Sequence, residues 1–226
     1  IGVPVEFLGE GTDERVKKAI WEAIQKFEDL GASYTEVSLP SLEFSLAAYY
    51  IIAMSEASSN LARYDGLRYG YRIPKEVSDW STVYSKNRRI GFGPEVRRRI
   101  ILGTYALSAG YYNRYYLKAL KIRTLIRRDF EKIFREFDVL MGPTMPIPPF
   151  KIGEKIENPL AVYMCDVLTV PANLTGCPAI SVPCGFSDGL PIGLQIMGKP
   201  FDEGRLLGTA YTFEKNTDFH KRRPEL

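Results

Sequence analysis

Charged residues of opposite sign in this chain could bind the two ends of a free amino acid. Arginine suits the carboxylate end, because its planar guanidinium group donates two parallel hydrogen bonds to a carboxylate. Arg97, Arg98 and Arg99 are consecutive in a segment with helical spacing. Each helical step turns the side chain by about 100°, so at most one or two of the three can face one cavity. A solvated basic helix face is the alternative interpretation.

Asp166 is the candidate for the ammonium end. It interrupts the otherwise apolar segment 161–170, where an unpaired carboxylate would lose its hydration at a high cost in free energy. We therefore expect a cation beside it. A helix cap or an internal salt bridge would explain the residue equally well.

The sequence offers no catalytic residue of its own. The single histidine, His220, stands in a charged tail near the C-terminus, and no Gly-Ser-rich nucleophile turn occurs. The first residues, 1–5, read as a core strand with no turn before it. We therefore interpret the chain as part of an enzyme.

Tyrosines and cysteines have ordinary structural explanations. Tyr49 and Tyr50 lie on an apolar stripe of helical spacing, and such aromatics are mostly core residues whose hydroxyl groups find a local partner. The same holds for a second cluster, Tyr111, Tyr112, Tyr115 and Tyr116. The three cysteines, Cys165, Cys177 and Cys184, are too few for a zinc site or a disulfide framework. We expect reduced thiols, no bound metal and a cytoplasmic protein.

The elements that must position these residues predict an α/β fold. With 226 residues and 45% apolar content, the chain can bury one large core or at most two small ones. Helical periods cover residues 16–30, 42–61 and 96–137, and a last helix begins at an Asp202 cap and runs to about Lys215. The first begins at a Thr12 or Asp13 cap and ends at Gly31. The helix at 42–61 should be largely buried, and the small side chains of residues 54–60 should let another backbone approach closely. Short β-rich runs lie between the helices, at 1–5, 34–39, 139–141, 179–184 and 192–197.

Proline and glycine mark the breaks. Pro94 suits the first turn of a helix, and Gly110 should bend the following segment or divide it in two. Residues 66–80 and 143–149 should be irregular, the second because its prolines exclude a helix or a central strand. Asp188-Gly189 predicts a tight hairpin turn. No run approaches the roughly 20 apolar residues that cross a bilayer, so we expect no membrane segment.

Charge is concentrated in one block. Residues 86–135 hold 14 Lys and Arg against three acids, a net +11, while the rest of the chain is −8. Such a block usually faces something acidic, which could be RNA, a protein partner or the chain's own acidic remainder.

Three strings resemble one family closely. Residues 49–70, beginning YYIIAMSEASSN, residues 91–104, GFGPEVRRRIILGT, and residues 191–202, PIGLQIMGKPFD, are similar to the A subunits of glutamyl-tRNA(Gln) amidotransferases. The last string is shared across amidase-signature enzymes, and the first two are more specific. The resemblance covers the whole chain, residues 1–226, but only the C-terminal half of such a subunit.

The resemblance implies an α/β/α fold around a mixed sheet and a glutaminase that uses a Ser, cis-Ser, Lys triad. All three triad residues belong to the N-terminal half, so none is assigned here and the chain alone should be inactive. By resemblance, Arg99 would bind the glutamine α-carboxylate and Asp166 the α-ammonium, with Tyr49 or Tyr50 lining the pocket.

The resemblance also implies partners. The ammonia would pass to a B subunit, which uses ATP and Mg²⁺ and makes most contacts with tRNA, while a small C subunit wraps the pair into a heterotrimer. This chain itself would bind no cofactor. Two alternatives stay open: a stand-alone amide hydrolase, and a non-catalytic RNA-binding module that uses the basic block.

Overall fold

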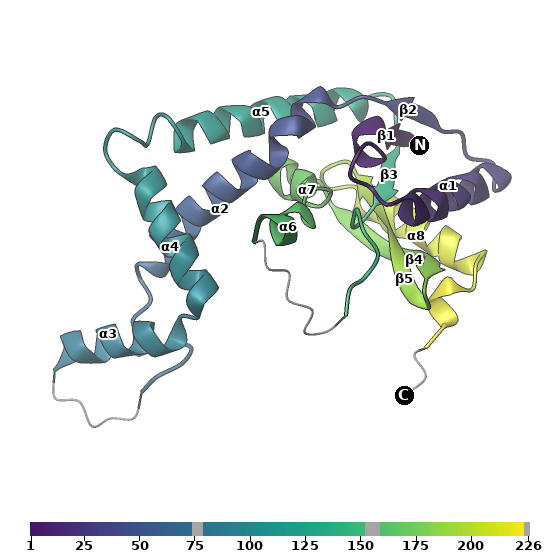
Figure 1. The fold of residues 1–226 in the computed structure, drawn as a ribbon. Coiled ribbons are helices and arrows are strands. Elements are labelled where there is room, and N and C mark those ends of the chain that lie inside the picture. The colour runs from purple at the N-terminus through teal and green to yellow at the C-terminus, as the bar shows by residue number, and fades with distance from the viewer. Residues whose placement is uncertain (74–78, 152–158, 224–226) are drawn as a thin grey trace. The chain divides into compact units, whose positions relative to one another are not determined.

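The computed structural model describes residues 1–73, 79–151 and 159–223 (Figure 1). They form two compact units, one made of Ile1–Leu46 with Ile122–Leu226 and the other of Ala47–Lys121. The first unit contains the sheet, and the second is helical.

The sheet is mixed, as expected for the fold class. The strands are β1 (Gly2–Pro4), β2 (Thr35–Val37), β3 (Val139–Pro143), β4 (Ala179–Ser187) and β5 (Leu190–Gly198). In the order β2-β1-β3-β5-β4, β1 runs parallel to β2 and β3, whereas β5 runs antiparallel to β3 and β4. All five β-rich runs read from the sequence are therefore strands.

Helices cover both faces of this sheet. On one face α1 (Glu14–Asp29) and α8 (Glu203–Lys215) enclose the main core, which includes Phe27, Met141 and Phe213. On the other face Gln195 of β5 donates from Nε2 to the Leu168 carbonyl, 2.8 Å away, just before α7 (Val170–Thr175). Three layers result, in agreement with the expected α/β/α arrangement.

The ends of α1 follow the sequence signals. Asp13 is the N-cap, and its carboxylate accepts from the Arg15 amide at 2.8 Å. Gly31 follows the C-cap with φ of +95°, a conformation that glycine adopts without strain. The hairpin is also confirmed, since Asp188 and Gly189 both have positive φ, 51° and 79°, as a tight primed turn requires.

Two expectations, one for strand β3 and one for the start of α8, need correction. Pro143 ends the central strand β3, paired with Leu194, although we expected no central strand there. The ladder tolerates it because Pro143 and Leu194 form a non-hydrogen-bonded pair: the amide that bonds to β5 is that of the next residue, Thr144, to the Gly193 carbonyl at 2.9 Å. Asp202 occupies the N-cap position of α8, but its carboxylate binds Arg205 Nε at 2.9 Å rather than a helix amide.

The second unit contains most of α2 (Ser45–Leu61), all of α3 (Trp80–Gly91) and α4 (Pro94–Leu107), and the start of α5 (Tyr116–Ile133). Pro94 is the first helical residue of α4, as predicted. Gly110, with φ of +86°, lies in the turn that separates α4 from α5, so the long period is two helices. The irregular segment expected at 66–80 ends where α3 begins, and its residues 74–78 lie outside the described residues.

Helix α3 was not expected, and a single side chain explains where it begins. The carboxylate of Asp79 accepts from the amides of Ser81 and Thr82, at 3.2 and 2.9 Å, and from the Thr82 hydroxyl at 2.6 Å. These bonds, that from the Thr82 side chain foremost, lower the pKa of Asp79. The helix N-terminus favours the same ionised form.

This lowered pKa predicts that α3 loosens in acid. A carboxyl group whose folded pKa lies below its unfolded value of about 4 stabilises the fold above that pH and ceases to do so as pH falls through the folded pKa. Hydrogen-exchange protection of the α3 amides should therefore drop between about pH 5 and pH 3. Asp79→Asn keeps a capping oxygen without the charge, and the drop should be smaller in it. Equal drops in both proteins would contradict the assignment.

Shorter elements complete the described residues. They are the 3₁₀ turns η1 (Val5–Phe7), η2 (Pro40–Phe44) and η3 (Phe219–Lys221) and the short helix α6 (Pro159–Met164). The cysteines are free thiols, and burial raises the pKa of Cys184 to about 12. Within the described parts of the chain, no helix has the length and apolarity that a bilayer crossing demands.

Candidate functional site

The three consecutive arginines of α4 do not share one partner. Arg97 donates from Nε and Nη2 to the carbonyls of Phe92 and Arg89, at 2.8 and 2.9 Å, and so ties α4 to the end of α3. Arg98 Nη1 and Arg99 Nε bind the two oxygens of Glu95, at 2.6 and 3.0 Å. The prediction that all three cannot face one cavity is confirmed.

Arg99 is the arginine that reaches an aromatic surface. Its guanidinium carbon lies 5.9 Å from the centroid of the Tyr50 ring on α2. Tyr50 is 9% exposed, and the Tyr49 ring meets it edge-on at 5.2 Å and 80°. A cation over an aromatic face is attracted by the ring quadrupole. The structure therefore brings together three of the four residues singled out from the sequence.

Glu95 belongs to this cluster, although we did not single it out. It stands four residues before Arg99 on one face of α4, a spacing at which opposite charges attract. That spacing was readable in the sequence. Because Glu95 holds one edge of the Arg99 guanidinium group, it fixes the direction in which the remaining N–H groups point.

Small side chains set the separation of α2 and α4. A Cβ atom at Gly103 would lie 2.0 Å from the Met54 carbonyl oxygen, and the Ser58 and Thr104 hydroxyls are hydrogen-bonded at 2.9 Å. The expected close backbone approach along residues 54–60 is thus confirmed. The expectation that α2 is largely buried holds for one face only, since Glu56, Ser59 and Asn60 are exposed.

Asp166 lies in the sheet-containing unit, in the turn between α6 and α7. Its carbonyl accepts from the amides of Thr169 and Val170, each at 3.0 Å. The residue is exposed in this structure, so the desolvation argument for a cation beside it does not apply. The N-cap position of α7 is occupied by Thr169 rather than by Asp166.

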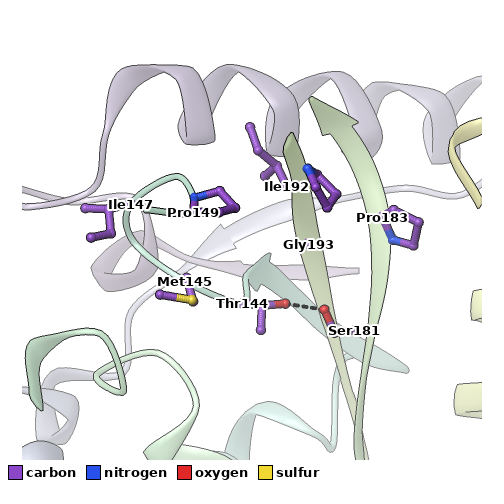
Figure 2. A pocket seen from close by; sticks show the side chains of 9 residues that line it. Thr144, Met145, Ile147, Pro149, Ser181, Pro183, Ile192 and Gly193 are labelled. Atoms are coloured by element: carbon purple, nitrogen blue, oxygen red, sulfur yellow. Dashed lines mark hydrogen bonds between the residues drawn. The ribbon is translucent and has the colours of Figure 1, made fainter. Parts of the chain in front are cut away.

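A separate cavity of about 260 Å³ opens in the sheet unit, between the loop after β3 and the strands β4 and β5 (Figure 2). Thr144 and Ser181 share a hydrogen bond of 2.6 Å at its floor. Gly193 leaves room for this pair, since a Cβ there would lie 2.6 Å from the Ser181 oxygen. Within the described chain, the side chains that line this cavity are all uncharged.

The residues of this cavity were not among the candidate site residues expected from the sequence. One wall contains Pro191, Ile192 and Gly193, which begin the string PIGLQIMGKPFD. The proline-rich loop from Thr144 to Pro149 forms the opposite wall. Its clustered prolines were a signal for a rigid pocket loop. Among the described residues, no three His, Cys, Asp or Glu side chains converge as they would around a metal ion.

Comparison with known proteins places the chain in a family. The amidase family model matches residues 1–207, and the chain belongs to this family. The more specific resemblance is also confirmed: the chain is 66% identical to the A subunit of the glutamyl-tRNA(Gln) amidotransferase from Methanosarcina barkeri, over 99% of the chain and 47% of that protein. The chain thus spans about half the length of the curated relatives it matches.

Solved structures agree with the fold. The crystal structure of the A subunit of the Thermotoga maritima glutamyl-tRNA(Gln) amidotransferase is 40% identical, with a TM-score of 0.72, and the match covers 96% of this chain and 42% of that one. The crystal structure of an amidase is 27% identical, with a TM-score of 0.74, and the match covers 95% of this chain and 45% of that one. The mixed α/β fold expected from the sequence is confirmed.

Proposed function

We propose that the chain is the glutamine-binding portion of the glutaminase subunit of a tRNA-dependent amidotransferase. The subunit would release ammonia from glutamine, and the complex would use it to convert Glu-tRNA(Gln) to Gln-tRNA(Gln) in protein biosynthesis. The observation that supports this most directly is Arg99, oriented by Glu95 and set over the Tyr50 ring, in a chain so similar to amidotransferase A subunits.

The roles of the residues follow from charge. Arg99 binds the α-carboxylate of glutamine through guanidinium N–H groups, while Glu95 holds its Nε. Tyr50, with Tyr49 against its ring, forms an apolar wall beside the ligand. Asp166 binds the α-ammonium group. A ligand held at both ends presents its side-chain amide in one orientation, which is how binding energy serves catalysis.

The reacting groups are proposed to lie outside this chain. We assign the Ser, cis-Ser, Lys triad to the polypeptide that corresponds to the other half of the relatives, and we infer that the chain alone is inactive. The relatives are named as one lettered subunit of an amidotransferase, which supports a multi-subunit complex. We infer partner B and C subunits in the cytoplasm, with ATP, Mg²⁺ and most tRNA contacts on the B subunit.

A stand-alone amide hydrolase is the second candidate. The uncharged cavity at Thr144 and Ser181 favours it, because a neutral amide would need no opposite charges for recognition (Figure 2). The amidase crystal structure also shares the fold at 27% identity. An RNA-binding module is less favoured, because several arginines of the basic block bind carbonyls and carboxylates of the chain itself: Arg88, Arg97, Arg98, Arg99, Arg123 and Arg127.

A substrate panel separates the two enzyme candidates. The complete subunit should hydrolyse glutamine with a kcat/KM at least about 10-fold above that for simple neutral amides, since only glutamine offers both charged ends. Glutamine lacking its α-carboxylate charge, as the amino-acid amide, is the matched control and should lose most of this advantage. Preference for a neutral amide would overturn the amidotransferase proposal in favour of the hydrolase.

A further inference from the structure

A second surface of the helical unit has the features of a protein-docking groove. It lies between α3 and α4, encloses about 480 Å³ and is open to solvent. Its lining residues all belong to these two helices and the residue that follows α3: Tyr84, Ser85, Arg88, Arg89, Phe92, Arg97, Ile100 and Ile101. In α4, Ile101 lies four positions after Arg97, so the two share one face of the helix. Arg99 lies about 200° around the helix from Arg97. The groove is therefore distinct from the Arg99–Tyr50 contact and independent of the proposed function.

Two cations of the groove are held in place by the chain itself. Arg88 Nη1 donates to the carbonyls of Leu61 and Tyr64, at 2.6 and 3.2 Å, and its guanidinium carbon lies 5.2 and 5.1 Å from the rings of Tyr84 and Phe92. Arg97 is fixed by its bonds to main-chain carbonyls at the end of α3. Side chains that are already ordered lose little conformational entropy when a partner binds.

The charges of the groove are all of one sign. In the described part of the chain, Arg88, Arg89 and Arg97 line it together with no aspartate or glutamate. The unit around it, residues 47–121, contains 13 Lys and Arg against 5 Asp and Glu, a net +8. Charge complementarity therefore requires an acidic occupant.

The apolar part of the groove decides the kind of occupant. Ile101 is 68% exposed, and beside it lie Ile100 and the rings of Tyr84 and Phe92. A nucleotide base would need a free aromatic face to stack on, but the Arg88 guanidinium group already lies over the rings of Tyr84 and Phe92. Two of the three guanidinium groups also bind main-chain carbonyls of the chain itself. A peptide with aliphatic side chains on one face and carboxylates beside them matches both parts.

We propose that the α3–α4 groove docks an acidic amphipathic helix from a partner protein. Its aliphatic side chains would cover Ile100 and Ile101 between the two helices, and its carboxylates would meet Arg89 and Arg97 at the rim. This is the helix-in-groove mode of recognition, in which anchors recur at helical spacing.

Binding of a synthetic peptide to the 226-residue chain tests this. The probe is a fluorescein-labelled helical peptide of about four turns, with Leu at helical spacing and Glu at the flanking positions, measured by anisotropy. Its control carries Gln in place of every Glu. We expect the Glu peptide to bind at least about 10-fold more tightly than the Gln peptide.

Matched variants locate the binding surface. Arg89→Glu and Ile101→Ala should each weaken the Glu peptide by about 10-fold or more, while Arg114→Glu and Leu125→Ala, exposed and outside the groove, should change affinity less than about two-fold. Equal losses in Arg89→Glu and Arg114→Glu would reduce the interaction to general charge and overturn the proposal. So would absence of peptide binding, or tighter binding of a labelled single-stranded RNA that Ile101→Ala leaves unchanged.

Discussion

Arg99→Ala in the complete subunit is expected to lower kcat/KM for glutamine by about 10-fold or more. The size follows from a charge-assisted hydrogen bond to a carboxylate, which contributes about 1.5–3 kcal/mol. The substitution also removes the cation above the Tyr50 ring, while Glu95 keeps its ion pair with Arg98. The measurement is steady-state glutaminase kinetics, with KM and kcat determined separately. Arg99→Lys should lose part of the activity, because it keeps the charge but not the planar fork.

Arg98→Ala is the matched control for this prediction. Arg98 is the next residue on the same helix and binds the same Glu95 carboxylate, but one helical step turns it about 100° away from Arg99. It should change kcat/KM less than about two-fold. Equal losses in the two variants would mean that Glu95 pairing, rather than carboxylate recognition by Arg99, matters. Unchanged kinetics in Arg99→Ala would remove the main support of the proposed function.

Local signals in the sequence predicted most of the fold. The 3.6-residue period and the Asp13 and Gly31 ends define α1, and Asp188-Gly189 defines the hairpin, because in each case neighbouring residues alone determine the backbone. Helix α3 escaped notice, since its start depends on one capping carboxylate, Asp79, after a segment without period. Pro143 was excluded from a central strand, although it stands opposite Leu194 in a non-hydrogen-bonded pair, where the ladder to β5 needs no amide and the bond comes from the next residue, Thr144.

The candidate site was predictable in type but not in arrangement. Composition and spacing selected the three consecutive arginines and the tyrosine pair, and the family resemblance then pointed to Arg99. The structure brings Arg99 and Tyr50 together. Which arginine faces α2 depends on the rotation of α4, and that rotation is set by the contact of Gly103 with Met54, two residues far apart in sequence. Burial of Asp166 was inferred from its apolar neighbours, but those neighbours form a turn in which the carboxylate-bearing residue is exposed.

This dependence on one glycine leads to the second large effect. Gly103→Ala is expected to lower the free energy of unfolding by about 2–3 kcal/mol, as overpacking of a tight contact does. The added methyl group would lie 2.0 Å from the Met54 carbonyl oxygen and 2.7 Å from Ser58 Cβ. The first of these atoms is backbone, so it cannot turn aside, and α4 must shift away from α2. Urea denaturation followed by circular dichroism measures the change.

Gly208→Ala is the matched control, because the same substitution at this position should raise rather than lower the free energy of unfolding. Gly208 lies inside α8, and a Cβ there would meet nothing within 4 Å. Alanine should therefore stabilise by about 0.5–1 kcal/mol through its higher helix propensity. A similar gain in Gly103→Ala would show that α2 and α4 are not in close contact at this point. The same contact sets Arg99 over Tyr50, so Gly103→Ala should also lower kcat/KM for glutamine in the complete subunit. Gly208→Ala should leave the kinetics unchanged.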